Sequence, residues 1–295
     1  MLSFTTWFPA CCFFFVAYKK ISLNRASQEQ VIKKYSGQLE KLGCKIPGCF
    51  EVEDIHHWRV DYKKLRAFLR MSTSGTKEPK PLISVDLKTL YKIAGTIRDI
   101  QLFIPAFQTA FPDYFSDTPV YYSLLQRKLF IEKEDYINVY EKISFPSEEE
   151  TWCNWLPDYL TNERIKKFVQ ENITAIRLLL IVPITDKNLH SIRKHLKDII
   201  YNIHTCSSFW GIPFPVAAWK NEKGMNDMAL ELGNYMDTCN KLLFFEPAYT
   251  NLLPLEEKKI LKSIQEDWMN EKDKQVKLVT ERINQLQLFQ EVKKI

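Results

Sequence analysis

The sequence has little glycine and few of the cysteine patterns that hold small domains together. Only eight of its 295 residues are glycine, and no long stretch alternates between apolar and polar side chains. Glycine-containing turns and strands of alternating polarity are typical of sandwiches and barrels, so their scarcity argues against those folds. The seven cysteines are scattered and include no Cys-x-x-Cys pair. We therefore expect neither a disulfide framework nor a structural zinc site, and a reducing compartment, the cytoplasm, fits best.

Signatures of phosphate-processing enzymes are missing as well. No glycine-rich loop of the type Gly-x-x-x-x-Gly-Lys occurs. The Glu-x-Glu-x-Lys strand of triphosphate-hydrolysing tunnel enzymes is approached only at Glu51 and Glu53, which lack the lysine. No nucleophile with a base and no carboxylate and metal set stands out. We therefore expect a protein that is not an enzyme and uses no cofactor.

The overall composition is that of an ordinary soluble globular protein, with 45% hydrophobic and 26% charged residues. The net charge of +5 is mild, so the placement of charge is more informative than its amount. Residues 2–18 are strongly apolar, contain Pro9 and follow no basic residue, which makes a poor signal peptide. Either this stretch is a mispredicted start or a segment packed onto the domain, or it is a membrane anchor.

Residues 55–71 carry the clearest pattern in the chain. Basic residues at offsets of 0, 3, 7, 10 and 14 fall within an arc of about 80° on one side of an α-helix, along about 21 Å. They are His56, Arg59, Lys63, Arg66 and Arg70. A separate apolar stripe can enter a core; it comprises Trp58, Tyr62, Leu65 and Leu69. No acidic residue of this helix lies on the basic face, so the pattern indicates an anionic ligand with many charges.

Both stripes return 134 positions later. The basic one reappears as His190, Arg193, Lys197 and His204, and the apolar one as Ile192, Leu196, Ile199 and Ile203. Downstream of each copy, a glycine and an aspartate keep a spacing of four, as Gly95 with Asp99 and Gly233 with Asp237. These matches indicate an internal duplication. The second copy has diverged, because Asp198, Ile200 and Met236 stand where the first has Lys64, Arg66 and Arg98.

A helix of the pattern His-x-x-Arg-Val-x-x-Lys-Lys-Leu-Arg, followed by Gly-x-x-Arg-Asp and a weaker repeat of both, resembles the conserved histidine α-helical domain (CHAD) family. The resemblance covers about residues 18–290. It implies an all-α fold of two helical bundles, related by a pseudo-twofold axis around a basic central groove. It also implies binding of inorganic polyphosphate. We expect a single domain over residues 19–293, with halves at about 19–145 and 147–293.

Arginine offers phosphate a planar fork of donors and lysine a compact charge, while a protonated histidine donates hydrogen bonds. The predicted polyphosphate-binding residues are His56, Arg59, Lys63, Lys64, Arg66, Arg70 and Arg98 in the first half, and His190, Arg193, Lys194, Lys197 and His204 in the second. We expect Asp99 to pair with an arginine of the stripe. A metal site at His56 and His57 is not expected, because adjacent helical side chains point about 100° apart.

Apolar periodicity predicts about eight helices and almost no strand. Their approximate ranges are 19–42 (ending at Gly43), 51–71, 82–109, 120–143, 152–182 in one piece or in two around Pro157, 189–204, 222–245 and 255–291. Loops are expected at 72–81 and 206–219. Ser147 and Glu150 have the spacing of a capping box at the divide between the halves. The aromatic residues of 103–115 and 121–122 are expected in the core.

Two other functions stay open. The basic surface could bind nucleic acid, although the resemblance favours polyphosphate over nucleic acid. Alternatively, the chain could be an adaptor whose long C-terminal helix recruits a partner. If the protein binds polyphosphate, its partners would include proteins or granules associated with that polymer. A membrane is not expected as a partner.

Overall fold

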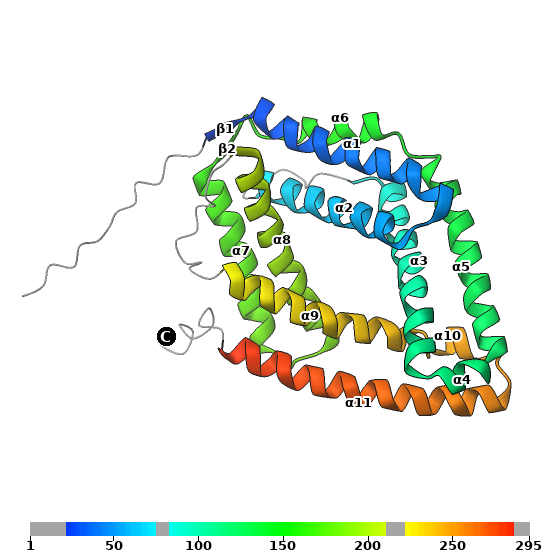
Figure 1. Ribbon diagram of the computed structural model, residues 1–295. Helices are drawn as coiled ribbons and strands as arrows, with labels where there is room; N and C mark the ends of the chain where they lie inside the picture. Colours follow the sequence, from blue (N-terminus) through cyan, green and yellow to red (C-terminus); the bar gives the residue numbers. More distant parts are fainter. Residues whose placement is uncertain (1–21, 75–82, 211–221, 286–295) are drawn as a thin grey trace, which may run out of the picture.

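The computed structural model describes residues 22–74, 83–210 and 222–285, which are almost entirely helical (Figure 1). The predicted all-α class is confirmed. Within these ranges the chain forms eleven helices and two strands of three residues each. None of the described helices is long and apolar enough to cross a bilayer. The apolar segment 1–18, most of both predicted loops and the end of the last predicted helix lie outside the described residues.

Four pairs of long helices form the sides of a ring (Figure 1). The pairs are α1 (Arg25–Cys49) with α2 (Val52–Ser72), α3 (Val85–Ala110) with α5 (Pro119–Tyr140), α7 (Asn162–Ile181) with α8 (Asp186–Trp210), and α9 (Glu222–Leu243) with α11 (Leu255–Gln285). In turn, α2 packs against α3, α3 against α9, α9 against α8 and α8 against α2. These four are the inner helices, and their partners lie outside them.

The order of elements in residues 22–140 recurs in residues 159–285. In the first part, β1 (Ser22–Asn24) precedes α1, α2, α3, the short α4 (Pro112–Ser116) and α5. In the second, β2 (Tyr159–Thr161) precedes α7, α8, α9, the short α10 (Pro247–Thr250) and α11. The two strands pair with each other in antiparallel fashion, with Leu23 opposite Leu160. The helix α6 (Phe145–Asn154) connects the two parts.

The first predicted helix boundary is wrong, because α1 continues through Gly43 to Cys49. A Cβ at Gly43 would lie 2.5 Å from Cε2 of Tyr140, so this glycine allows α5 to approach rather than ending the helix. The helix instead ends at Phe50, which adopts a left-handed conformation with φ of 52° and donates its backbone N–H to Ile46 O.

The predicted capping box is also wrong. The helix α6 already begins at Phe145, after Ser144, so Ser147 lies inside it. Farther on, the predicted helix over 152–182 is divided around Pro157 into the end of α6, β2 and α7. Proline disfavours helical conformation in the residue before it, which accounts for the break.

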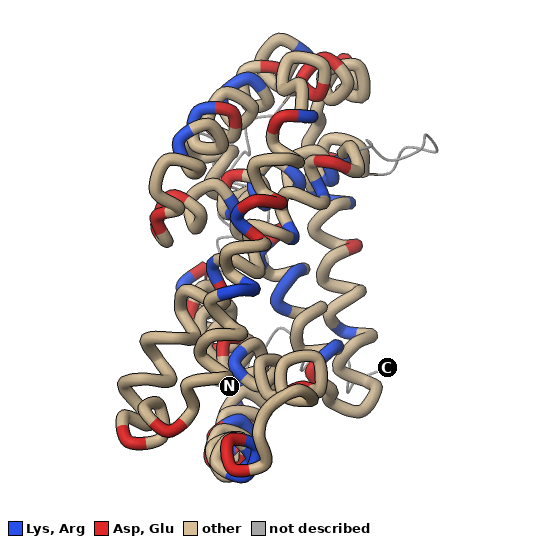
Figure 2. The backbone as a smooth tube through the Cα atoms, turned by 90° about the vertical axis from the view of Figure 1, so that its right-hand side faces the viewer, with Lys and Arg blue, Asp and Glu red and all other residues tan. Residues whose placement is uncertain are grey.

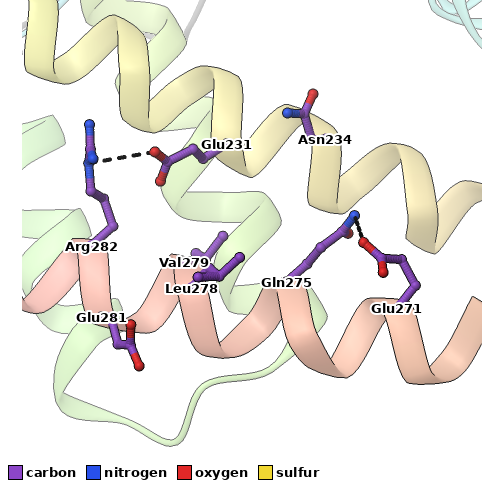
Figure 3. Close-up of a pocket in the computed structure, with 8 residues that line it drawn as sticks. All are labelled: Glu231, Asn234, Glu271, Gln275, Leu278, Val279, Glu281 and Arg282. Atoms are coloured by element: carbon purple, nitrogen blue, oxygen red, sulfur yellow. Dashed lines mark hydrogen bonds and ion pairs between the residues drawn. The ribbon is translucent and has the colours of Figure 1, made fainter.

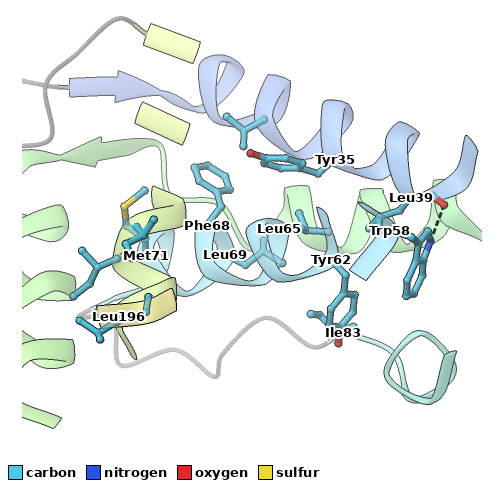
Figure 4. Close-up of a cluster of buried hydrophobic side chains, with 14 of the residues drawn as sticks. Tyr35, Leu39, Trp58, Tyr62, Leu65, Phe68, Leu69, Met71, Ile83 and Leu196 are labelled. Atoms are coloured by element: carbon cyan, nitrogen blue, oxygen red, sulfur yellow. Dashed lines mark hydrogen bonds between the residues drawn. The ribbon is translucent and has the colours of Figure 1, made fainter. Parts of the chain in front are cut away.

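Both apolar stripes enter the larger of two hydrophobic clusters (Figure 4). All four members of the α2 stripe are buried, and in α8 only Ile203 is partly exposed. The second cluster lies where α3 and α5 meet α10, α11 and the end of α9. It contains Phe103, Phe107 and Tyr121, so the predicted core position of these aromatic residues is confirmed. Burial of the stripes fixes the rotation of α2 and α8 and thereby the direction of their basic faces.

A buried carboxylate caps α5 from the neighbouring helix α11. Oε1 and Oε2 of Glu257 accept the backbone N–H groups of Val120 and Tyr121 at 3.1 and 2.8 Å, and Glu257 is only 5% exposed. Glu257→Ala would leave two N–H groups at a helix start without their acceptor, which costs about 1–3 kcal/mol for each buried group. We expect a melting temperature several degrees lower. The exposed neighbour Glu256 provides the control. Equal melting temperatures of Glu257→Ala and Glu256→Ala would contradict the capping role of Glu257.

Candidate functional site

The basic face of α2 meets basic residues of α3 and α8, which are two of the other inner helices. Lys63 is the centre of this arrangement. Burial lowers its pKa to about 7, and four neighbouring positive charges act in the same direction: Arg59, Arg193, Arg98 and Lys197. These charges come from three helices and from both parts of the chain. Lys63 is therefore buried among other cations, with too few carboxylates nearby to stabilise its protonated form.

A second group of charges continues the arrangement along α2 and α8. Burial, followed by the charges of Arg66 and Arg70, lowers the pKa of Lys194, whereas Asp198 opposes this shift. His190 has a pKa lowered by burial and then by Lys194, Arg193 and Arg66. At the other end, burial lowers the pKa of His56, and the charges of Arg98 and Lys63 add to the effect. Both histidines are therefore mainly neutral at pH 7.

Ten of the twelve residues predicted from the sequence are linked by these mutual charge effects. We call them the cation cluster: His56, Arg59, Lys63, Arg66 and Arg70 on α2, Arg98 on α3, and His190, Arg193, Lys194 and Lys197 on α8. Lysine and arginine positions are spread over the whole molecule (Figure 2). It is thus the convergence of three helices, not the number of charges, that distinguishes this site.

Three arginines of the cation cluster have a buried donor without an acceptor. The Nε–H groups of Arg66, Arg98 and Arg193 are inaccessible to solvent and form no hydrogen bond within the described part of the protein. A buried donor without a partner costs about 1–3 kcal/mol, and more when the group is charged. An anion bound beside these side chains would provide both the missing acceptors and the missing negative charge.

Arg59 differs from these three arginines because α3 holds its guanidinium group. Its Nη1 donates to Tyr91 O at 2.5 Å, and its Cζ lies 4.3 Å from the centre of the Tyr91 ring. Gly95 of α3 leaves the space that the guanidinium group occupies. Tyr91 was not among the residues predicted from the sequence. Both its backbone carbonyl and its ring contact Arg59, and the carbonyl contact is one that no side-chain pattern could have indicated.

Two carboxylates bind predicted cations and reduce their free charge. Asp198, which is 4% exposed, accepts a hydrogen bond from Nη1 of Arg70 at 2.5 Å and joins α8 to α2. Lys64 pairs with Asp61 of its own helix at 3.1 Å and faces the ring of Tyr35 on α1. As expected, no acidic residue of α2 lies on its basic face. Asp198 of the neighbouring helix α8, however, neutralises Arg70 on that face. Asp198 comes from a helix whose packing the sequence did not reveal.

The predicted ion pair of Asp99 with a stripe arginine does not form. Burial raises the pKa of Asp99, while the charges of Arg59 and Arg98 lower it. These arginines are thus near, but neither makes an ion pair with Asp99 in the described structure. Asp237 of α9 also acts on Asp99, so the aspartates of the two matching sequence segments lie near each other.

Two predicted residues remain outside the cation cluster. Lys64 points toward α1, as described above, and His204 is exposed near the end of α8. Among the described residues, no hydrogen bond or ion pair connects the His204 side chain with the cluster. His195, which the sequence did not single out, lies beside the cluster, and its Nδ1 is 2.8 Å from Asn172 Oδ1. Because Asn172 Nδ2 donates to Phe168 O, its Oδ1 is the acceptor, and His195 Nδ1 carries the proton.

The described residues contain no group of three or more histidine, cysteine or acidic side chains placed to hold a metal ion. A surface hollow of about 480 Å³ lies elsewhere, between α9 and α11 (Figure 3). Its lining includes Glu231, Glu271 and Glu281, and Arg282 lies 3.6 Å from Glu231. This acidic hollow offers no basic face to a polyanion and is not part of the cation cluster.

Comparison with known proteins identifies the class. Residues 37–239 match the CHAD domain family, so the chain belongs to that family. The crystal structure of the CHAD domain from the plant Ricinus communis has the same fold, with a TM-score of 0.66 and 11% sequence identity. The alignment covers 92% of this chain and 94% of that one. None of the curated proteins matches the chain.

Proposed function

We propose that this protein binds inorganic polyphosphate through the cation cluster and has no enzymatic activity of its own. The observation that carries the proposal is the set of three buried arginine Nε–H groups, contributed by α2, α3 and α8, that have no acceptor among the described residues. Phosphate oxygens are acceptors for which arginine is well suited, and a polymer of phosphates supplies many of them in a line. Membership of the CHAD family supports the same ligand.

The proposal includes a basic groove between two duplicated halves. Repetition of the element order, the 134-residue offset of the stripes and the pairing of β1 with β2 support the duplication. The groove would have α2 and Arg98 as one wall and α8 as the other. We propose a cytoplasmic location, for which the odd number of scattered cysteines is the argument, and polyphosphate-associated proteins or granules as further partners.

The test is a titration of the protein with long-chain polyphosphate beside single-stranded RNA with the same number of phosphates. Binding through about five phosphate contacts should weaken on the order of 100-fold between about 50 and 200 mM salt, because condensed counterions are released. RNA should compete poorly, since its sugars and bases separate the phosphates. Equal binding of both polymers would reduce the cation cluster to a general polyanion surface.

Binding of neither polymer would overturn the proposal and favour the adaptor hypothesis. In that case, deletion of residues 255–295 should remove the partner. The absence of enzymatic activity has its own measurement. Release of phosphate from the polymer, in the presence of a divalent cation, should not exceed the rate without protein.

A further inference from the structure

The two matching arginines of the cation cluster are held in different ways. Arg59 and Arg193 occupy equivalent positions of the two repeats, and a glycine of the following inner helix faces each of them. A Cβ at Gly95 would collide with Nη1 of Arg59 and lie 2.9 Å from its Cζ. A Cβ at Gly233 would lie 3.4 Å from Nη2 of Arg193, which is ordinary contact. A methyl group at position 95 would thus displace the guanidinium group of Arg59, whereas one at position 233 would fit beside Arg193.

Aromatic side chains complete the contact surface in the first repeat. The rings of Tyr62 and Tyr91 stack with their centres 4.4 Å apart, and Tyr62 is 2% exposed. Arg59 lies over Tyr91, and the Cζ of Arg66 lies 5.8 Å from the Tyr62 ring centre. A guanidinium group over an aromatic face is attracted to it and is restricted in orientation. The pair of tyrosines therefore supports two arginines of the α2 face.

The second repeat lacks this support. By the sequence offsets, Leu196 stands where the first repeat has Tyr62, and Ala229 where it has Tyr91. The Nε–H of Arg193 finds no acceptor among the residues that the structure describes. The first repeat thus presents Arg59 in one fixed orientation, whereas within the described ranges none of these restraints acts on Arg193.

We propose that Tyr91 and Gly95 form a seat for the guanidinium group of Arg59 and that Gly95 is a positioning residue of the anion site. The consequence for polyphosphate rests on the proposed function, but the seat itself does not. A fixed donor loses less conformational entropy when a ligand binds, so the first repeat provides the preorganised wall. Arg193 provides the wall that adjusts to the ligand.

The experiment combines Gly95→Ala with Arg59→Gln and uses Gly233→Ala as the matched control. Alanine normally stabilises a helix interior relative to glycine. In the chain with Arg59, the added methyl group collides with the guanidinium group, so Gly95→Ala should lower the melting temperature. In the Arg59→Gln background, the same change should raise it. Gly233→Ala should leave the melting temperature unchanged or raise it.

Polyphosphate affinity is measured on the same variants. Gly95→Ala should weaken binding about tenfold, the equivalent of one lost charge-assisted contact. Gly233→Ala should change it less than twofold, and Gly95→Ala should have no further effect once Arg59 is Gln. If Gly95→Ala changed the melting temperature in the same direction with Arg59 and with Arg59→Gln, the proposal that Tyr91 and Gly95 hold Arg59 would be wrong. If the unmodified protein did not bind polyphosphate, the proposed function would fail, and the melting data would still decide on the seat.

Discussion

The double variant Arg66→Glu with Arg193→Glu is expected to lose polyphosphate binding, with affinity reduced on the order of 100-fold or more. Each arginine has a buried Nε–H without an acceptor in the described part of the chain, and each lies on a different wall of the proposed groove. A hydrogen bond to a charged group contributes about 1.5–3 kcal/mol, and reversal of the charge adds repulsion. These two are better choices than Arg59, because Arg59 also holds α2 against α3. Isothermal titration with polyphosphate measures the loss.

The matched control is Lys166→Glu with Lys167→Glu on the outer helix α7. Both lysines are exposed, and the pair changes the net charge by the same amount. This control should bind polyphosphate within about twofold of the unmodified protein, a difference typical of a screened surface charge. A similar loss in both double variants would show that net charge alone governs binding. A circular dichroism spectrum of each variant checks that helix content is retained.

The second large effect is a dependence of affinity on pH through Lys63. Burial and the surrounding cations lower its pKa to about 7. A polyanion favours the protonated amine, so binding raises this pKa and takes up a proton whenever Lys63 starts neutral. Below pH 7 the amine is already charged, so Lys63 should cause no further change of polyphosphate affinity with pH. Between pH 7 and 8.5 affinity should fall by up to tenfold for each pH unit.

Lys63→Met should remove most of this dependence. The histidines of the cation cluster do not replace it in that range, because their lowered pKa values leave them neutral above pH 7. The stability of the free protein should change with pH in the opposite direction. Since the unfolded chain keeps a proton on Lys63 up to about pH 10.4, stability from this group rises with pH above 7. An affinity independent of pH from 7 to 8.5 in the unmodified protein would contradict the central position of Lys63.

Much of the α2 and α8 structure could be predicted because one sequence pattern specifies both faces of a helix. The apolar stripe at Trp58 and Tyr62 determines which side enters the core, and the basic side follows from the 3.6-residue period. Repetition at one offset extended the prediction to α8. The all-α class and family membership, both predicted from these residues, are confirmed.

The contacts that connect distant segments could not be predicted in this way. Arg70 and Asp198 are 128 positions apart, and nothing in either helix indicates that α2 crosses α8 at that point. The backbone carbonyl and the ring of Tyr91 both contact Arg59, and this pairing of residues from two helices depends on how α2 and α3 pack. Gly43 indicates a helix end in the sequence because glycine often has that role, but in the fold the ring of Tyr140 needs the space. Each of these depends on tertiary packing rather than on local sequence.

The most direct test of the central claim is a crystal structure of the protein with a polyphosphate of defined length. The account predicts phosphate oxygens within hydrogen-bond distance of Nε of Arg66, Arg98 and Arg193, with Arg59 still bound to Tyr91 O. Phosphates bound only to the exposed lysines of outer helices, with these three arginines unchanged, would contradict it.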